Sequence, residues 1–215
     1  MLPQLLPMLA VPSLPFDSPK HHFEIKWDGV RALAAVDTDG WRLWGRERSD
    51  YTARYPELDV LRRLPVGSLV DGELIALRGG LPDLKWLMRR HHLADPWQVR
   101  WAWRWCPVRY VLFDVLYWAG SCLLSQPFAQ RRAMLAEAGA RLPAPEVLIS
   151  SGVVGAGKAF YEQVVGQGHE GVMAKHLFAP YRAGRRSHGW KKIKPRRRLR
   201  GDSSRNCLDV GGDRR

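Results

Sequence analysis

Short runs of alternating polar and apolar residues, separated by tight turns, constrain the fold of this chain more than any other feature. Residues 23–27 alternate between large apolar and charged side chains, which is the pattern of a strand with one buried face. Apolar runs at residues 31–36 and 41–44 flank the turn-forming sequence Asp-Thr-Asp-Gly of residues 37–40. This part of the chain therefore predicts antiparallel strands joined by a tight turn.

Further along the chain, strand-like and helix-like patterns follow one another in no regular alternation. The predicted helices span residues 55–64, 84–92, 126–138 and 158–166. The predicted strands span residues 108–118, 171–176 and 189–194, together with two shorter runs within 68–77 that Asp71-Gly72 separates. This mixed order predicts an α+β fold and not a doubly wound sheet.

Composition divides the chain into three parts. Five prolines in residues 1–22 fix the backbone and remove amide donors, which predicts an extended leader that packs on the domain. Residues 23–194 hold the strand and helix patterns and form one predicted domain. Residues 195–215 carry seven arginines, three aspartates and few large apolar side chains, which predicts a basic, disordered tail.

The charge balance favours anionic partners. The 34 lysines and arginines exceed the 21 acidic residues, giving a formal net charge of +13, and cationic proteins bind nucleic acids because neutralised phosphates release counterions. The three cysteines are too widely spaced for a zinc site or a redox dithiol. No basic head precedes the apolar start, and no later stretch is long enough to span a bilayer. We therefore expect a cytoplasmic protein that binds no membrane.

Residues 24–31, Glu-Ile-Lys-Trp-Asp-Gly-Val-Arg, are the most informative segment for chemistry. Lys26 stands near a predicted strand end, with acidic residues on both sides and a glycine that permits a sharp turn. A lysine attacks an electrophile only as the free amine, which burial or neighbouring cations favour. Lys192 and Lys194 are candidates for such cations. Taken alone, the segment is explained better as an exposed hairpin of alternating charges.

Two segments in the middle of the chain add candidate ligands. Asp71 and Glu73 stand on one side of a predicted strand and suit a hard cation or a ribose hydroxyl. Phe113, within the buried run 111–114, offers an aromatic face on which a base can stack. Alone, the first segment is an ordinary hairpin turn and the second is ordinary core.

Two later segments add charge. Glu170 and Lys175 flank a short predicted strand, which alone would be a solvated edge. In residues 190–194, Trp-Lys-Lys-Ile-Lys, alternation places Lys192 and Lys194 on one face, where a phosphate would relieve the repulsion between the two ammonium groups. Alone, this segment would be a solvated basic strand.

In this order, the five segments resemble the nucleotidyltransferase motifs of ATP-dependent DNA ligases, especially bacterial ligases of the end-joining type. The resemblance extends from Leu5 to Lys194 and includes residues 7–10, 51–58 and 181–187. It implies an adenylation domain of nucleotidyltransferase (ATP-grasp-like) fold, in which two antiparallel sheets flanked by helices hold the nucleotide between them.

The resemblance also implies a reaction and its cofactors, ATP and Mg²⁺. Lys26 would attack the α-phosphate of ATP, forming a lysyl-AMP and releasing pyrophosphate. The AMP would pass to the 5′-phosphate of nicked duplex DNA, and a 3′-hydroxyl would then displace it, in DNA repair or recombination. Transfer of this kind depends mainly on positioning and charge neutralisation, which lysines and Mg²⁺ provide.

Further residues match the family by motif position. Glu24 corresponds to the residue beside the adenine amine, Phe113 to the base-stacking aromatic side chain and Glu73 to a ribose or nick contact. The remaining matches are Glu170 and Asp71 at the metal, Lys192 and Lys194 at the α-phosphate, Arg31 and Arg46 near the ribose and the nick phosphate, and Asp28. The sequence around Arg46 reads Gly-Arg-Glu-Arg at residues 45–48, where the family commonly has Ser-Arg-Asn-Gly.

DNA ligases of this family follow the last lysine-rich motif with an OB-fold domain that wraps DNA. The 21 residues after Lys194 are too few for such a barrel. Three explanations stay open: a truncated chain, an OB-fold on a separate polypeptide, and a minimal or degenerate form. We therefore expect inefficient nick sealing by this chain alone, and a separate OB-fold or repair protein is a candidate partner.

A different enzyme class is suggested by residues 152–158, Gly-Val-Val-Gly-Ala-Gly-Lys, which match the glycine-rich end of a P-loop. Ala159 stands where P-loop enzymes carry the Ser or Thr that binds Mg²⁺. We favour a surface loop that enters the predicted helix.

Four tryptophans interspersed with arginines, Trp97, Trp101, Trp103 and Trp105, suggest a stacking platform for single strands. Strand alternation would place the last three on one face, and we expect that face to be buried against the body of the domain.

Other functions use the same motifs. A basic DNA-binding module with no activity would retain them as scaffold, and an RNA ligase or a capping guanylyltransferase shares the same lysine chemistry. Transfer of label from the α-phosphate of a nucleotide separates the enzymes from the passive binder.

Overall fold

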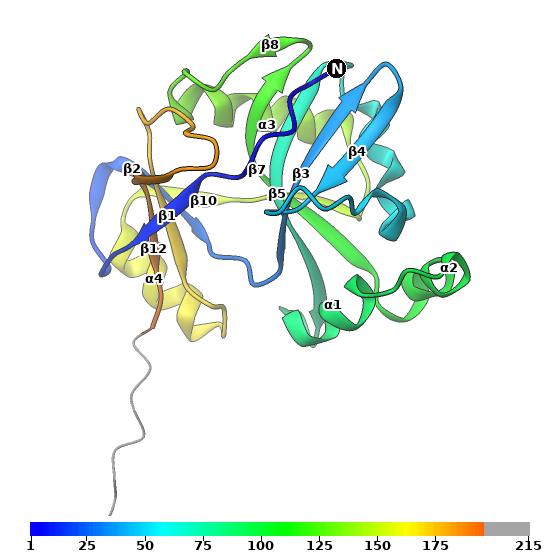
Figure 1. The fold of residues 1–215 in the computed structure, drawn as a ribbon. Coiled ribbons are helices and arrows are strands. Elements are labelled where there is room, and N and C mark those ends of the chain that lie inside the picture. The colour runs from blue at the N-terminus through cyan, green and yellow to red at the C-terminus, as the bar shows by residue number, and fades with distance from the viewer. Residues whose placement is uncertain (196–215) are drawn as a thin grey trace, which may run out of the picture.

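Two β-sheets form the frame of the protein in the computed structural model, which describes residues 1–195 (Figure 1). Within these residues, one sheet has five strands and the other has seven. Helices pack against both sheets, with α1 and α3 on the seven-stranded sheet and α4 on the five-stranded sheet. The α+β fold predicted from the mixed element order is therefore confirmed. The predicted disordered tail, residues 195–215, lies outside the described residues except for Pro195. Within the described residues, no helix is long and apolar enough to cross a membrane.

The first sheet has the strand order β1-β12-β11-β2-β10. Its strands are β1 (Leu9–Pro12), β2 (Ser18–Ile25), β10 (Gly152–Gly155), β11 (Val172–His176) and β12 (Arg186–Ile193). The predicted strands 171–176 and 189–194 correspond to β11 and β12, whereas the strand predicted at residues 23–27 covers only the last three residues of β2, which begins five residues earlier. The glycine-rich segment 152–158 was predicted as a surface loop, but its first half is the edge strand β10, paired antiparallel with β2.

The second sheet has the order β4-β3-β5-β7-β8, with β6 on β5 and β9 on β7. Its strands are β3 (Val30–Asp37), β4 (Gly40–Trp44), β5 (Ser68–Arg78), β6 (Leu81–Pro82), β7 (Val108–Trp118), β8 (Ser121–Cys122) and β9 (Val147–Ile149). The predicted hairpin is β3–β4, and the strand predicted at residues 108–118 is β7.

The predicted break at Asp71-Gly72 is wrong, because β5 is one continuous strand. Its pairing with β3 runs without interruption, and the irregularity is confined to its pairing with β7. A Cβ atom at Gly72 would collide with the ring of Tyr110 and the carbonyl oxygen of Val111. The glycine therefore allows β5 and β7 to approach closely and does not end the strand.

The helices are η1 (Thr52–Arg54), η2 (Pro56–Arg63), α1 (Leu84–His91), α2 (Pro96–Trp105), α3 (Phe128–Arg141) and α4 (Gly157–Gly166). Three predicted helices correspond to α1, α3 and α4, and the one predicted at residues 55–64 is the 3₁₀ helix η2. The α1 helix begins at Asp83, whose side chain accepts a hydrogen bond from the backbone N–H of Trp86 (2.9 Å).

The prediction of a buried tryptophan strand at residues 101–105 is wrong. The segment is the end of helix α2, which begins after Asp95 as N-cap with Pro96 in the first turn. Val99 and Ala102 are its buried residues, so the tryptophans of the helix lie in solvent.

The N-terminal segment joins the two sheets, as the blue trace from the N-terminus to β1 shows (Figure 1). The backbone N–H of Leu2 donates to Asp37 (2.8 Å), and the indole N–H of Trp44 donates to the carbonyl of Leu5 (2.8 Å). A few residues later, β1 pairs in parallel with β12 of the other sheet. Met8 is fully buried in the core cluster between the sheets. This segment therefore contributes to the wall of the space between them.

Acid should destabilise the fold partly through His91. Its ring Nδ1 lies 2.7 Å from the hydroxyl oxygen of Tyr55, and burial, with the charge of Arg54 and then of His92, lowers the pKa of His91 to about 4. The unfolded chain takes up this proton near pH 6.5, so the stabilising effect is complete above pH 6.5 and is lost as the pH falls towards 4.

We expect the free energy of unfolding to fall between pH 6 and 5, with His91 contributing about 1 kcal/mol per pH unit. Urea unfolding at both pH values, for the unaltered chain and for His91→Gln, measures the difference in slope. Equal slopes for the two proteins would show that His91 is not held neutral.

Candidate active site

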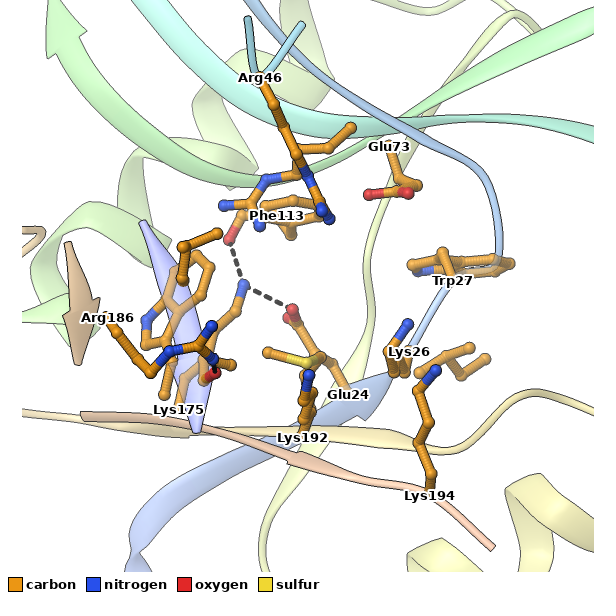
Figure 2. A pocket seen from close by; sticks show the side chains of 16 residues that line it. Glu24, Lys26, Trp27, Arg46, Glu73, Phe113, Lys175, Arg186, Lys192 and Lys194 are labelled. Atoms are coloured by element: carbon orange, nitrogen blue, oxygen red, sulfur yellow. Dashed lines mark hydrogen bonds and ion pairs between the residues drawn. The ribbon is translucent and has the colours of Figure 1, made fainter. Parts of the chain in front are cut away.

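A cavity of about 360 Å³ opens between the two sheets (Figure 2). Strands of both sheets contribute side chains to it, so the cavity exists only when the sheets face each other. The residues predicted as site residues that line it are Glu24, Lys26, Arg31, Arg46, Glu73, Phe113, Lys192 and Lys194. The structure thus brings together residues that are up to 170 positions apart in the sequence.

Lys26 follows the last residue of β2, and its side chain forms an ion pair with Glu170, at the start of β11. Lys194, just beyond β12, binds the other oxygen of the same carboxylate. Burial acts to raise the pKa of Glu170, but hydrogen bonds from Lys194 and Lys26 lower it below its usual value. Figure 2 shows the ends of the Lys26 and Lys194 side chains next to each other, and Lys192 lies near the end of β12, two residues before Lys194.

Gly171 allows these three strand ends to meet. Its φ angle is 144°, and a Cβ atom there would collide with the carbonyl oxygen of Ile193. The carbonyl of Gly171 accepts a hydrogen bond from the backbone N–H of Lys26 (2.9 Å). A glycine at this position therefore sets the distance between Lys26 and the end of β12.

Asp28 lies on the loop after Lys26 and does not line the cavity. Burial, and then the nearby charge of Glu170, raise the pKa of its carboxyl group. The structure places it beside the cluster formed by Lys26 and Glu170, without a direct partner of its own among the ion pairs of residues 1–195.

Glu24 and Lys175 form a buried ion pair under the cavity, with 2.5 Å between the Lys175 Nζ and the Glu24 Oε1 and each residue only 1% exposed. Burial raises the pKa of Glu24 and lowers that of Lys175. The Lys175 Nζ also donates to the carbonyl oxygen of Phe113 (3.0 Å). Within residues 1–195 the other Glu24 oxygen, Oε2, is buried without a hydrogen-bond partner. A ligand with an N–H group would satisfy it.

Phe113 and Trp190 form the aromatic part of the lining. The Arg31 guanidinium carbon lies 4.8 Å from the Phe113 ring centre and 5.2 Å from that of Trp190. The Lys175 Nζ lies 4.3 and 4.4 Å from the same two centres. The aromatic rings and the two cations therefore pack as one unit, and a base-stacking role for Phe113 stays a prediction.

Asp71 is fully buried and holds Arg31. Its two oxygens accept hydrogen bonds from the Arg31 guanidinium (2.7 and 2.6 Å), and one of them also accepts from the hydroxyl of Tyr181 (2.6 Å). That hydroxyl in turn accepts from the backbone N–H of Met8 (2.9 Å). These bonds occupy both oxygens of the carboxylate, so a metal ion could bind Asp71 only if some of them broke. The predicted metal contact of Asp71 stays a prediction.

Glu73 and Arg46 lie on the far wall of the cavity from the lysines (Figure 2). Glu73 on β5 lies directly across from Arg31 on the neighbouring strand β3 in the backbone pairing of the sheet. Burial raises the pKa of Glu73 to about 7, against the opposing charges of Arg31, Lys26 and Arg46. Arg46, in the exposed loop after β4, supplies a cation at the cavity mouth.

Several residues of this site were not predicted from the sequence. Lys175 and Trp190 were within segments of interest but received no role, although alternation places Lys175 on the same face as Met173. Trp27 and Arg186 also line the cavity. The role of Tyr181 depends on partners far away in sequence, and no local pattern indicates it.

Solved structures with the same arrangement of sheets are DNA ligases. The ligase domain of M. tuberculosis LigD superposes with a TM-score of 0.74 and 28% identity, covering 88% of this chain and 59% of that chain. A mycobacterial DNA ligase D complexed with ATP and MES gives a TM-score of 0.72 and 29% identity, covering 88% and 60%. The fold and the cavity therefore define a ligase nucleotidyltransferase domain.

The family model for the ATP dependent DNA ligase domain matches residues 7–194. The chain belongs to this family, and the predicted resemblance is confirmed. A probable DNA ligase of Anaeromyxobacter sp. (strain Fw109-5) is 38% identical over 204 residues, which cover 90% of this chain and 38% of that protein. The SPbeta prophage-derived DNA ligase-like protein LigB of Bacillus subtilis is 29% identical over 180 residues, covering 83% and 63%. The chain thus spans less than two thirds of the length of these relatives.

Removal of the Tyr181 hydroxyl should destabilise the protein. Tyr181→Phe leaves the backbone N–H of Met8 unpaired and takes one hydrogen bond from Asp71, both in buried surroundings. We expect a loss of about 1–3 kcal/mol in the free energy of unfolding, measured by urea denaturation at pH 7.

Tyr161→Phe is the matched control, because Tyr161 is a partly buried tyrosine on α4 that packs against a different core cluster. An equal effect of the two substitutions would contradict the structural role of the Tyr181 hydroxyl.

Proposed function

We propose that residues 23–194 are the adenylation domain of an ATP-dependent DNA ligase, with residues 1–22 packed on it as a leader. The domain transfers AMP from ATP to Lys26 and then to the 5′-phosphate of nicked duplex DNA. The observation that carries this proposal is the position of Lys26, in one cavity with Lys192, Lys194 and the buried carboxylate of Glu24.

The first step forms a bond between the Lys26 Nζ and the α-phosphorus of ATP and breaks the bond to pyrophosphate, which leaves with its electron pair. Lys26 enters as the free amine and releases a proton. Lys192 and Lys194 neutralise the oxygens of the phosphate. Glu170, bound to Lys26 and Lys194, fixes the direction of the nucleophile.

The adenosine lies on the inner side of the cavity in this proposal. The Oε2 of Glu24, which makes no hydrogen bond and has the Arg132 guanidinium 3.9 Å away, accepts the adenine amine, and Lys175 holds the carboxylate through its other oxygen. Phe113 faces the base, Glu73 contacts the ribose or the nick, and Arg31 and Arg46 lie near the ribose and the nick phosphate. The Arg31–Asp71 pair sets the orientation of the guanidinium.

We propose Glu170 as the magnesium ligand; its two oxygens bind Lys26 and Lys194 in the structure, so the ion would replace at least one of these contacts. Within residues 1–195 there is no cluster of three His, Cys, Asp or Glu side chains that could hold a metal ion, but Mg²⁺ is commonly held by one or two carboxylates together with substrate phosphates. Glu170 is the carboxylate nearest to Lys26. When bound, the ion neutralises charge on the phosphates.

The net charge of the chain and the names of its relatives both support DNA as the partner. The net charge of +13 favours a polyanion, and the relatives are named DNA ligases. We propose nicked duplex DNA as the substrate, in cytoplasmic repair or recombination. For the sealing step, we also propose a separate OB-fold or repair protein as partner.

Incubation with ATP labelled at the α-phosphate tests the proposal. The unaltered chain should acquire label in a covalent bond, and Lys26→Ala should abolish it because no other lysine stands at the reacting position. Lys158→Ala is the matched control: Lys158 is the lysine of the P-loop-like segment, is exposed and does not line the cavity.

The variants separate the alternatives. Covalent label that Lys158→Ala removes and Lys26→Ala retains would contradict the proposal, because the adduct would then lie outside the cavity between the sheets. Absence of label from the unaltered chain, together with intact DNA binding, would contradict it in favour of a passive DNA-binding module.

Glu24→Gln should weaken the preference for ATP over GTP. The amide of the substituted side chain is uncharged, and its nitrogen donates hydrogen bonds, whereas the Glu24 carboxylate only accepts them. The adenine amine therefore loses a charged acceptor. We expect the ratio of labelling rates with ATP and GTP to fall by roughly 10- to 100-fold, with thermal unfolding as the check that the variant is folded. An unchanged ratio would remove Glu24 from base recognition.

A further inference from the structure

Helix α2 presents large aromatic side chains to solvent, which is unusual for tryptophan. Trp97 is 69% exposed, Trp101 52%, Trp103 51% and Trp105 43%. Tryptophan is normally buried over most of its surface, and Trp44 of the same chain is 1% exposed. Four exposed indoles on one ten-residue helix therefore need a reason other than core packing.

Part of this helix forms a groove of about 510 Å³ lined by Leu93, Trp97, Gln98, Trp101 and Trp105. We call it the tryptophan groove. Trp97, Trp101 and Trp105 follow one another at intervals of four residues, so they lie on one face of the helix. The ring of Trp105 is anchored by an edge contact with Trp86 of α1, with 5.3 Å between the ring centres.

Arginines lie among the indoles. The guanidinium carbon of Arg104 is 4.3 Å from the ring centre of Trp101 and 5.8 Å from that of Trp103. Arg100 is on the same helix and is exposed. Neither α1 nor α2 contains an aspartate or glutamate. The surface is therefore aromatic and cationic, which complements an anionic partner with flat rings.

The groove is separate from the cavity between the sheets. None of its lining residues lines that cavity, and Figure 1 shows α2 at the opposite side of the molecule from β12 and α4. The adenylation reaction therefore gives no reason for the exposed tryptophans.

We propose that the tryptophan groove binds an unpaired segment of DNA. Bases stack on Trp97 and Trp101, and Arg100 and Arg104 bind the flanking phosphates. Stacking tolerates any sequence because every base has a flat face. This goes beyond the proposed function, which requires only paired DNA at a nick. A protein that docks through exposed tryptophans would need acidic residues opposite the arginines, whereas nucleic acid supplies the rings and the negative charge together.

Fluorescence anisotropy tests the proposal with a labelled oligothymidylate of ~20 nucleotides and the full chain. The double variant Trp97→Ala/Trp101→Ala should weaken binding about tenfold or more, because each stacked base is lost with its indole. Arg100→Gln should lower the slope of log affinity against log salt by roughly 0.7, as expected for the loss of one phosphate contact to a single strand.

Controls separate this site from the catalytic cavity and from general surface effects. Phe178→Ala, which removes an aromatic side chain that is 64% exposed outside α2, should leave binding unchanged. Lys158→Ala, which removes an exposed cation that lines neither the groove nor the cavity between the sheets, should also leave binding unchanged, whether or not the chain is adenylated. Circular dichroism should show the same fold for all variants, as expected for substitutions in solvent.

Two results would overturn the proposal. One is unchanged affinity of the Trp97→Ala/Trp101→Ala variant for the oligothymidylate. The other is a concentration-dependent dimer in sedimentation that the same double variant abolishes without a change in affinity for DNA, which would make the groove a contact between copies of the chain.

Discussion

The carboxylate of Glu170 accepts hydrogen bonds from both Lys26 and Lys194, and the arrangement of the candidate site depends on this shared contact. Lys26 stands at the end of β2, Glu170 before β11 and Lys194 after β12, so the contact requires three strand ends at one point. Gly171 makes this possible, since a side chain there would meet the backbone of Ile193. Two ammonium groups are stable side by side only with an anion between them. Glu170 is that anion here, and a phosphate can take over part of this role when a nucleotide binds.

A second set of contacts keeps the two sheets facing each other. Tyr181, from the loop between β11 and β12, binds Asp71 on the central strand of the other sheet and Met8 in the N-terminal segment. The same Asp71 fixes Arg31, which packs on Phe113 and Trp190. The position of the cavity wall thus follows from one buried tyrosine hydroxyl and one buried carboxylate. Both lie below the lining, where they shape the site without being available to a ligand.

Local patterns predicted most elements, and distant contacts decided the rest. The Asp-Thr-Asp-Gly turn and the apolar run 108–118 specified β3–β4 and β7, because turn chemistry and β-branched composition act locally. The strand predicted at residues 101–105 is wrong, because alternating tryptophans have the same spacing as one face of a strand. The Asp95 cap and Pro96 instead start a helix. The parallel pairing of β1 with β12 joins segments about 180 residues apart, and no local pattern carries that information. In the site, motif order predicted eight of the lining residues, but the burial of Asp71 against Arg31 and Tyr181 became visible only in three dimensions.

Lys26 is the residue that we propose becomes covalently bonded to AMP. Peptide mass spectrometry after incubation with ATP and Mg²⁺, at neutral to alkaline pH where a phosphorus–nitrogen bond survives, identifies the residue that carries the adduct. We expect a mass increase of one AMP on the peptide that contains Lys26, with fragmentation assigning it to that residue. An AMP adduct on any other residue, with the Lys26 peptide unmodified, would show that Lys26 is not the nucleophile.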